Sequence, residues 1–325
     1  MTASIEQSSP RVWLNVLIPL CQTLLAVSII VANGFAFAVV KRQGMNIKPV
    51  TRILFRSLLL TNLYVGISIV VTQIVVIGWG HVMSDTTTNR ICHVSIGIGF
   101  SGAAGCVISL MTINIERYIS IEFPLRSIRL LTPRRAYVML AIKWLVMFSV
   151  VVIYSQELIR IPYYNREWKM CLPLYNNVQR SIMMVCAYLY MMLFVCLPSL
   201  VSISIYARIL VIVHRTISEE AKIKARFSSS SERRSKNKGP NKAAYTFLLV
   251  TATFVFAWTP TCSIYIYRLY VDEVHLYPQL EIASFFTLVS NHLCTTAVYV
   301  ARDMSFREAT VLFKRNKKIN VNHIM

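Results

Sequence analysis

A charged pair lies near one end of a long apolar segment of this sequence. Glu116, Arg117 and Tyr118 follow one another there, and the rest of the segment, 91–121, is almost free of charge. Ionised side chains at membrane depth are costly, so their presence points to a function. Cys92 lies 25 residues before Arg117, which in an α-helix corresponds to about 38 Å. Such a helix would join the two faces of a membrane and is suited to carry a signal across it.

The composition predicts the elements that must hold this pair. Hydrophobic residues make up 55% of the 325 positions and charged residues only 15%. A membrane-spanning helix needs about 20 apolar residues. The sequence predicts an all-α membrane protein, a seven-transmembrane helix bundle, with spans at roughly 13–40, 53–78, 91–120, 136–156, 181–213, 243–267 and 279–301. The first span ends in Lys41 and Arg42 and lacks a small-residue cleavage pattern, so we interpret it as a retained helix and not as a signal peptide.

The net charge of +20 is distributed unevenly. If the amino terminus is outside, 27 of the 34 Lys and Arg fall on the inner side, with Lys143 counted in the second inner loop. This asymmetry follows the positive-inside rule, and it favours contact with anionic membrane lipid over nucleic acid. We therefore predict an extracellular amino terminus at 1–12 and a seven-helix transmembrane domain at 13–301, with its third inner loop at about 215–242. A cytoplasmic amphipathic helix with a short tail would follow at 302–325.

Eight cysteines divide into two groups. Six fall inside the apolar segments, where a free thiol packs as a small hydrophobe: Cys21, Cys106, Cys186, Cys196, Cys262 and Cys294. Cys92 and Cys171 fall at the predicted outer face, in a compartment that permits a disulfide. We predict that these two cysteines form a disulfide, which would fix the second outer loop over the bundle.

The sequence disfavours other classes of membrane protein. No nucleotide, metal or nucleophile motif is present, so we expect no cofactor, no metal and no enzyme activity. A multi-pass transporter or channel is the alternative, because His292 and Asn62 lie at membrane depth. The absence of an inverted repeat with broken helices counts against it. An intramembrane hydrolase would need paired carboxylates or a serine nucleophile motif.

A series of positions, each in the expected helix, resembles the rhodopsin-like (class A) G-protein-coupled receptors. The likeness runs from the first helix to about Phe313. Taken alone, an aromatic position could be ordinary packing and a proline could be a simple kink, whereas the order of the whole set is specific. The positions that carry the resemblance are Asn33, Trp79, Cys92, Glu116, Arg117, Tyr118, Pro124, Leu125, Trp144, Cys171, Pro198, Tyr206, Phe254, Trp258, Pro260, Tyr299 and Phe306.

The resemblance implies a mechanism. An extracellular agonist shifts the helix arrangement, helix six swings outward at Pro260, and a heterotrimeric G protein binds the inner crevice with Leu125 in a hydrophobic socket. Glu116 holds Arg117 at rest. The resemblance also implies the plasma membrane as location, and arrestin and receptor kinases as further partners. The residues implied in G-protein coupling and activation are Glu116, Arg117, Tyr118, Pro124, Leu125, Tyr206, Phe254, Trp258, Pro260 and Tyr299.

The same resemblance places a ligand pocket in the outer halves of helices three, five, six and seven. Its walls would be Gly99, Phe100, Ala103, Tyr190, Met191, Thr261, Tyr265, Phe285 and Val289. Gly99 stands where amine receptors carry an aspartate, and Val289 where opsins carry a lysine. A buried amine needs a counter-charge, so we expect a neutral or lipid-like small molecule, or a peptide that uses the charged rim of Arg268, Asp272, Glu273 and Glu281.

The chain departs from the family pattern at three places. The cluster that holds an internal Na⁺ in relatives has lost its acid and consists of Asn62, Cys106, Asn291 and Thr295. The seventh-helix Asn-Pro becomes Thr295-Thr296. The acid that many relatives carry 20 residues before the sixth-helix proline becomes Pro240, close to Lys242. We expect weak sodium dependence and appreciable basal signalling.

Overall fold

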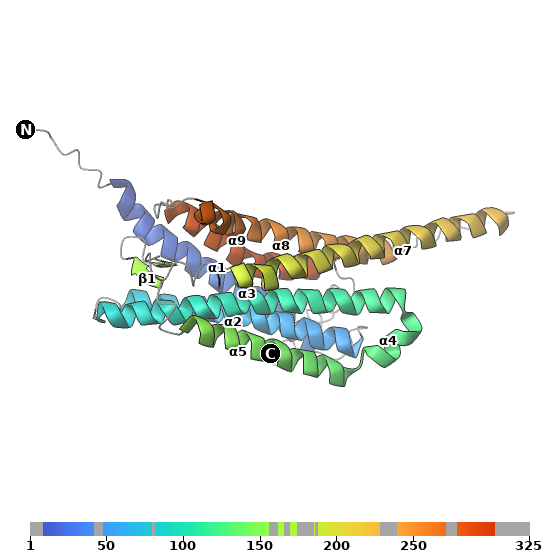
Figure 1. The fold of residues 1–325 in the computed structure, drawn as a ribbon, viewed down its shortest axis with the longest axis horizontal. Coiled ribbons are helices and arrows are strands. Elements are labelled where there is room, and N and C mark those ends of the chain that lie inside the picture. Colours follow the sequence, from blue (N-terminus) through green and yellow to red (C-terminus); the bar gives the residue numbers. More distant parts are fainter. Residues whose placement is uncertain are drawn as a thin grey trace, which may run out of the picture.

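A computed structural model describes residues 9–41, 48–79, 82–155, 162–165, 170–173, 185, 188–227, 239–270 and 278–302. Within these ranges the chain forms a bundle of long helices that lie roughly along one axis (Figure 1). The elements are α1 (Ser9–Lys41), α2 (Pro49–Trp79), α3 (Asp85–Glu122), α4 (Pro124–Leu130), α5 (Pro133–Ser155), β1 (Pro162–Asn165), β2 (Met170–Pro173), η2 (Met192–Cys196), α7 (Leu197–Phe227), α8 (Gly239–Tyr270) and α9 (Pro278–Arg302).

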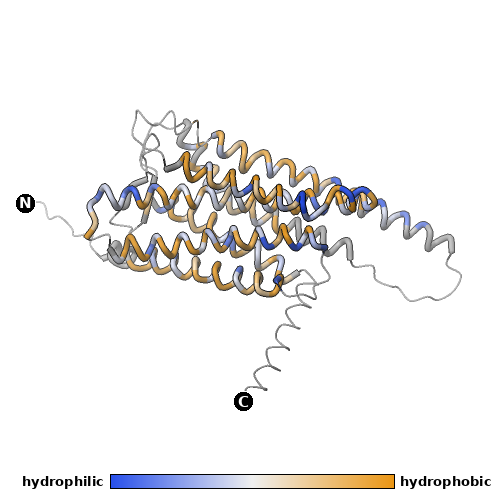
Figure 2. The backbone as a smooth tube through the Cα atoms, turned by 90° about the horizontal axis from the view of Figure 1, so that it is seen from below, coloured by the Kyte–Doolittle hydropathy of each residue, from blue (hydrophilic) through white to orange (hydrophobic). Residues whose placement is uncertain are grey.

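The helices are apolar on the outside of the bundle as well as inside. Val31, Ile74 and Leu145 are among many large apolar side chains that are mostly exposed, and the tube in Figure 2 is hydrophobic along most of the bundle. In the described residues, five helical stretches are long and apolar enough to cross a membrane: Val16–Lys41, Pro49–Gly78, Asp85–Glu122, Pro133–Ile153 and Tyr188–Thr216. A helix can face lipid in this way because its backbone N–H and C=O groups are hydrogen-bonded to each other. The bundle is that of a multi-pass membrane protein.

Helix α3 lies at the centre of the bundle, against α2, α5 and α7, while α8 packs mainly on α9. Glycines allow the close approach of α3 to its neighbours. A Cβ atom at Gly102 would overlap the side chain of Val65 on α2, and one at Gly105 would overlap Met147 on α5. Small residues serve this purpose in membrane helices, because packing and not water exclusion holds them together.

The fifth helical segment contains a local irregularity. Residues 188–191 are helical and lead into the π-helical turn η2, which ends two residues before Pro198. A proline lacks the N–H that would bond to the preceding turn, so the helix widens there. Helix α7 then continues to Phe227, beyond the ends of its neighbours (Figure 1). The predicted eighth helix, including Phe306, lies outside the described residues.

Two short elements were not anticipated from the sequence. Strands β1 and β2 form an antiparallel hairpin in which Tyr164 lies opposite Cys171. At the other end of the bundle, α4 forms a short helix between α3 and α5 (Figure 1). The hairpin is the exception to the predicted all-α fold among the described residues.

The assignment of Lys143 to an inner loop was wrong. Lys143 lies near the middle of α5, and only 3% of its surface is exposed. The error arose because basic residues were counted by their position in the chain, and the span predicted at 136–156 already contained this lysine. Without Lys143, 26 of the 34 Lys and Arg remain on the side that the sequence predicts to be the inner one.

Candidate functional site

The charged pair lies in the last turns of α3, at the α4 end of the bundle. Glu116 is buried, and its Oε1 accepts hydrogen bonds from Thr51 Oγ1 at 2.9 Å and Ser120 Oγ at 3.3 Å. The Nε atom of Arg117 lies 3.5 Å from Glu116 Oε2. Thr51 belongs to α2, so Glu116 is held by a neighbouring helix as well as by its own. Sequence reasoning did not identify this threonine.

Helix α4, which follows α3, presents an exposed apolar side chain close to the charged pair. Pro124 occupies the first turn of α4, where its missing N–H costs no hydrogen bond. Leu125 follows it and is 84% exposed. A leucine presented in this way is available to a partner with an apolar socket.

The two tyrosines assigned to the activation switch lie on α7 and α9. Tyr206 donates a hydrogen bond to Asn114 Oδ1 at 2.8 Å, and Asn114 Nδ2 donates to Ser202 Oγ at 3.1 Å. Tyr299 packs edge-on against Phe55 of α2, with ring centroids 4.9 Å apart. Asn114 lies one helical turn before Arg117, so Tyr206 is already held one turn from the charged pair.

The aromatic residues near Pro260 form a continuous stack. The rings of Phe254 and Trp258 lie 5.9 Å apart, and Tyr190 lies 6.3 Å from Trp258 and 5.2 Å from Phe100. Tyr190 also donates a hydrogen bond to the Phe100 carbonyl oxygen at 2.8 Å. The stack connects α3, the segment before α7, and α8 at the level of the proline.

The predicted ligand walls surround this stack. A Cβ atom at Gly99 would meet no atom of the described residues within 4 Å. Ala103, Thr261 and Val289 are buried, while Met191 and Phe285 are half-buried. The hydroxyl of Thr261 is buried without a hydrogen-bond partner among the described residues. Glu281 of the predicted rim is half-buried on α9. The structure does not describe the side chains of Tyr265, Arg268, Asp272 and Glu273.

The altered sodium cluster is reorganised around Asn62. Its Nδ2 donates to Asn33 Oδ1 at 2.9 Å, and its Oδ1 lies 2.9 Å from His292 Nδ1. Thr296, which replaces the family proline, donates to Asn33 Oδ1 at 2.6 Å. The hydroxyl of Thr295 instead lies 3.4 Å from Asn291 Oδ1, and Cys106 is buried on α3. Sequence reasoning grouped Asn62 with Asn291 and Thr295 and did not include Asn33 and Thr296 as its partners.

This network predicts weak sodium dependence. The oxygens of Asn62 and Asn33 already accept bonds inside the bundle, and a hard cation prefers carboxylate oxygens. Replacing KCl by NaCl should therefore shift the melting temperature of the purified protein by less than about 1 °C, because a ligand that does not bind the native state does not stabilise it. A shift of several degrees specific to Na⁺ would show that other oxygens form the site. The Asn62→Asp variant provides the comparison that should gain sensitivity.

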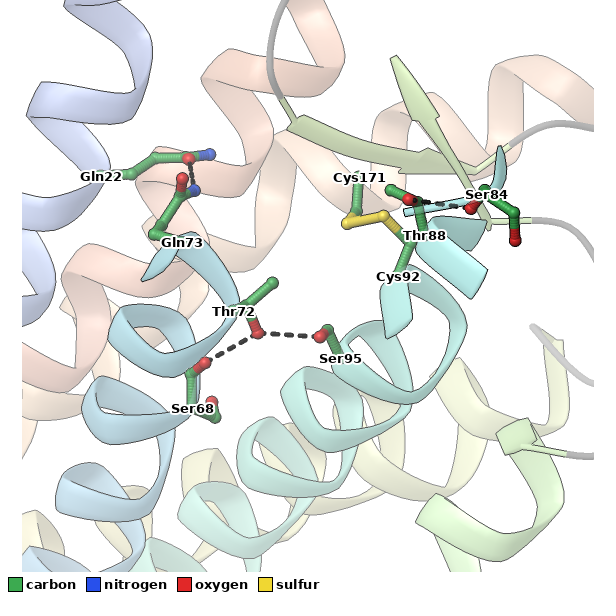
Figure 3. The surroundings of a disulfide bond; sticks show 9 residues. All are labelled: Gln22, Ser68, Thr72, Gln73, Ser84, Thr88, Cys92, Ser95 and Cys171. Atoms are coloured by element: carbon green, nitrogen blue, oxygen red, sulfur yellow. Dashed lines mark hydrogen bonds between the residues drawn. A yellow bond between two sulfur atoms is a disulfide. The ribbon is translucent and has the colours of Figure 1, made fainter. Parts of the chain in front are cut away.

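The opposite end of the bundle carries the disulfide. Cys92 and Cys171 are bonded, with their Cα atoms 5.3 Å apart, so the prediction of this bridge is confirmed. Figure 3 shows the bond between the first turns of α3 and the hairpin. The same figure shows Thr72 of α2 bonded to Ser95 of α3, at 2.8 Å. The hairpin is therefore held at the end of the bundle where the predicted ligand walls lie.

Comparison with known proteins agrees with this arrangement. The model of the 7 transmembrane receptor (rhodopsin family) matches residues 32–297. Adenosine receptor A3 of Canis lupus familiaris is 25% identical over 316 residues, 96% of this chain and 92% of that receptor. Adenosine receptor A3 of Ovis aries is 25% identical over 313 residues, 92% and 90% of the two chains. Galanin receptor type 2 of Homo sapiens is 28% identical over 156 residues, 47% of this chain and 35% of that receptor.

The family match covers most of the chain, including every helix that contributes to the charged pair, the aromatic stack and the disulfide. Members of this family are signalling receptors that couple to heterotrimeric G proteins, and they are not enzymes. The chain belongs to the rhodopsin family of seven-transmembrane receptors.

Proposed function

We propose that this receptor lies in the plasma membrane, crosses it seven times with its amino terminus outside, and binds a neutral small molecule between α3, α7, α8 and α9. The observation that carries the ligand class is the buried hydroxyl of Thr261, which has no hydrogen-bond partner among the described residues and lies on the same helix as Trp258 of the aromatic stack. A buried hydroxyl without a partner costs roughly 1–3 kcal/mol. A ligand that pairs with it recovers that energy, while a charged ligand would find no counter-charge among the described walls.

The names of two similar receptors suggest which ligands to test. The Adenosine receptors A3, matched over most of their length, are named for a neutral nucleoside, and the galanin receptor for a peptide. The described walls favour the first kind of ligand. A library of neutral small molecules that includes adenosine, with galanin in the peptide arm, should be read out by a G-protein dissociation sensor. An agonist found there should lose roughly tenfold or more in potency in Thr261→Val, since one buried hydrogen bond is worth about 1.5 kcal/mol. Activation by peptides alone would contradict this ligand class.

The coupling mechanism follows from the helix contacts. Helix α8 packs mainly on α9 and carries Pro260 within its length, so its end near α4 is free to pivot at the proline. Outward movement of that end would open a crevice beside Arg117, with Tyr206 moving one turn from Asn114 toward it. Glu116 and Thr51 oppose this step by holding Arg117 at rest. A ligand that binds the open arrangement better shifts the population.

The exposed Leu125 is the proposed contact with the G protein. Leu125→Asp should reduce nucleotide exchange at least tenfold, because burying an unpaired carboxylate in an apolar socket is strongly unfavourable. Val82→Asp is the matched control, since Val82 is 79% exposed at the other end of the bundle. Both variants should keep the wild-type melting temperature. Equal exchange rates in the two variants would exclude Leu125 as a contact.

We further propose that receptor kinases and arrestin act on the third inner loop. The serines at 228–231 lie beside Arg226, Arg233 and Arg234, whereas the sequence after Thr310 contains no serine or threonine. Phosphate would supply the negative charge that an arrestin-type partner binds. Truncation after Lys314 should therefore leave desensitisation intact, and serine-to-alanine changes at 228–231 should slow it. The reverse pattern in a time course of agonist response would refute this assignment.

A further inference from the structure

Lys143 is a buried cation that the mechanism so far does not use. It lies on α5, two residues before the exposed Leu145 and next to Trp144. A charge inside a membrane bundle is costly, and such residues face the interior and find partners there. In the described part of the chain no carboxylate pairs with its ammonium group.

The partners of Lys143 are neutral oxygen atoms from two other helices. Its Nζ atom donates to Thr61 Oγ1 at 2.8 Å, to Ser109 Oγ at 3.3 Å, and to both the hydroxyl and, at 3.3 Å, the carbonyl oxygen of Ser57. The ammonium also lies 4.8 Å from the centre of the Trp144 ring, a distance at which a cation is attracted to the ring face. The hydroxyl groups of Ser57, Thr61 and Ser109 and the carbonyl oxygen of Ser57 form an oxygen cage around the ammonium group.

The cage is one rung of a polar seam between α2 and α3. Going toward α4, the seam begins with the hydroxyl pair Thr72–Ser95 at 2.8 Å and continues with Tyr64–Ser101 at 3.0 Å. It ends with the bond from Thr51 to the buried carboxylate at 2.9 Å. Because α2 and α3 run antiparallel, the residue numbers of the bonded pairs fall along α2 as they rise along α3.

At the level of the cage, no described side chain of α2 forms a hydrogen bond directly with a described side chain of α3. Ser109 and Thr61 both bond back to carbonyl oxygens of their own helices, and the ammonium of Lys143 connects them. The next rung toward α4 is the one that holds Glu116, seven residues after Ser109 on α3. Seven residues are about two turns, so both rungs lie on the same face of α3.

We propose that Lys143 is a positioning residue that fixes the register of α2 and α3 and thereby keeps Glu116 on Thr51 and Arg117 in its resting place. The inference rests on the proposed function, because its readout is G-protein activation. Without the ammonium, the middle rung is lost and α3 is held to α2 less firmly. The bond from Thr51 to Glu116 then opens more often, and Arg117 is released without any ligand.

The first test replaces Lys143 by methionine, which keeps length and removes the donors. Receptor in lipid vesicles with purified heterotrimeric G protein should show ligand-free nucleotide exchange, per receptor, raised at least roughly fivefold, the lower end of typical allosteric coupling. Its melting temperature should fall by several degrees. Ile142→Met is the matched control, since Ile142 is the exposed neighbour on the same helix, and it should change neither quantity.

The second test restores the missing group chemically. Lys143→Ala lacks the atoms of n-propylamine, so adding n-propylamine should restore both the melting temperature and the low basal exchange. The same concentration of n-propanol, which has one donor and no charge, and of tetramethylammonium, which has charge and no donor, should not. If the lysine variants do not reach the membrane, Thr61→Val and Ser109→Ala remove single acceptors and should raise basal exchange to a smaller degree.

The outcomes separate the two proposals. If Lys143→Met melts and signals like wild type, Lys143 positions nothing and the inference is wrong. If it melts earlier but its exchange per receptor is unchanged, the cage is only a brace and the positioning role is excluded. If neither wild type nor any variant activates a G protein, the proposed function fails, whereas the cage itself still stands or falls on the melting temperature and its rescue by n-propylamine.

Discussion

Replacing Cys92 and Cys171 together by serine should destabilise the receptor and abolish high-affinity ligand binding. The bridge closes a loop with a sequence separation of 79 residues and connects a fully buried position on α3 to strand β2. Loss of a native disulfide of this kind typically costs roughly 2–5 kcal/mol. The predicted ligand walls lie at the same end of the bundle, so we expect that a hairpin released from α3 no longer covers them.

The measurement is the melting temperature of the purified receptor, together with the potency of an agonist from the screen. Cys21→Ser serves as control, because Cys21 is a free, half-buried thiol on α1; it should retain both values within error. A double serine variant that melts and responds like wild type would show that the hairpin is held by its other contacts with α3.

Appreciable ligand-free signalling is the second expected result. In many relatives an acid near the start of helix six reaches the motif arginine and favours the closed state. Here the corresponding position is Pro240, the second residue of α8, and Lys242 follows close by. Arg117 is thus paired with Glu116 on its own helix. Loss of such a coupling is worth roughly 1–3 kcal/mol, or about 5- to 150-fold in population.

The test compares wild type with Lys242→Glu. Nucleotide exchange without ligand should rise with receptor density in vesicles, and the acidic variant should lower its slope several-fold. Thr296 works against this basal activity, because its bond to Asn33 holds α9 against α1. A silent wild type together with an unchanged variant would mean that packing alone keeps α8 closed.

The sequence was sufficient for features that depend on local composition. Five of the predicted spans coincide with helices that are long and apolar enough to cross a membrane, because run length decides membrane insertion. Cys92 and Cys171 were recognisable because one lies at the mouth of a predicted span and the other between two spans. Phe254 and Trp258, four residues apart on α8, also meet in space as the helical period predicts.

Features that depend on contacts between helices were missed. The partners of Asn62 come from α1 and α9, and the cage around Lys143 from α2 and α3, so neither was readable from one segment. A signal for Lys143 did exist: a lone lysine inside an apolar run, with no acid within a turn, must find oxygens elsewhere in the bundle. The hairpin was not predicted because each of its two strands is only four residues long.

The most direct test of the central claim compares G-protein activation with solute transport in the same vesicles. The receptor is reconstituted with purified heterotrimeric G protein, and nucleotide exchange and solute uptake are recorded for wild type and Leu125→Asp. We expect wild type to accelerate exchange above empty vesicles, Leu125→Asp to lose that acceleration, and neither to transport solute. Saturable solute flux without any acceleration of exchange would contradict the receptor assignment and favour a transporter or channel.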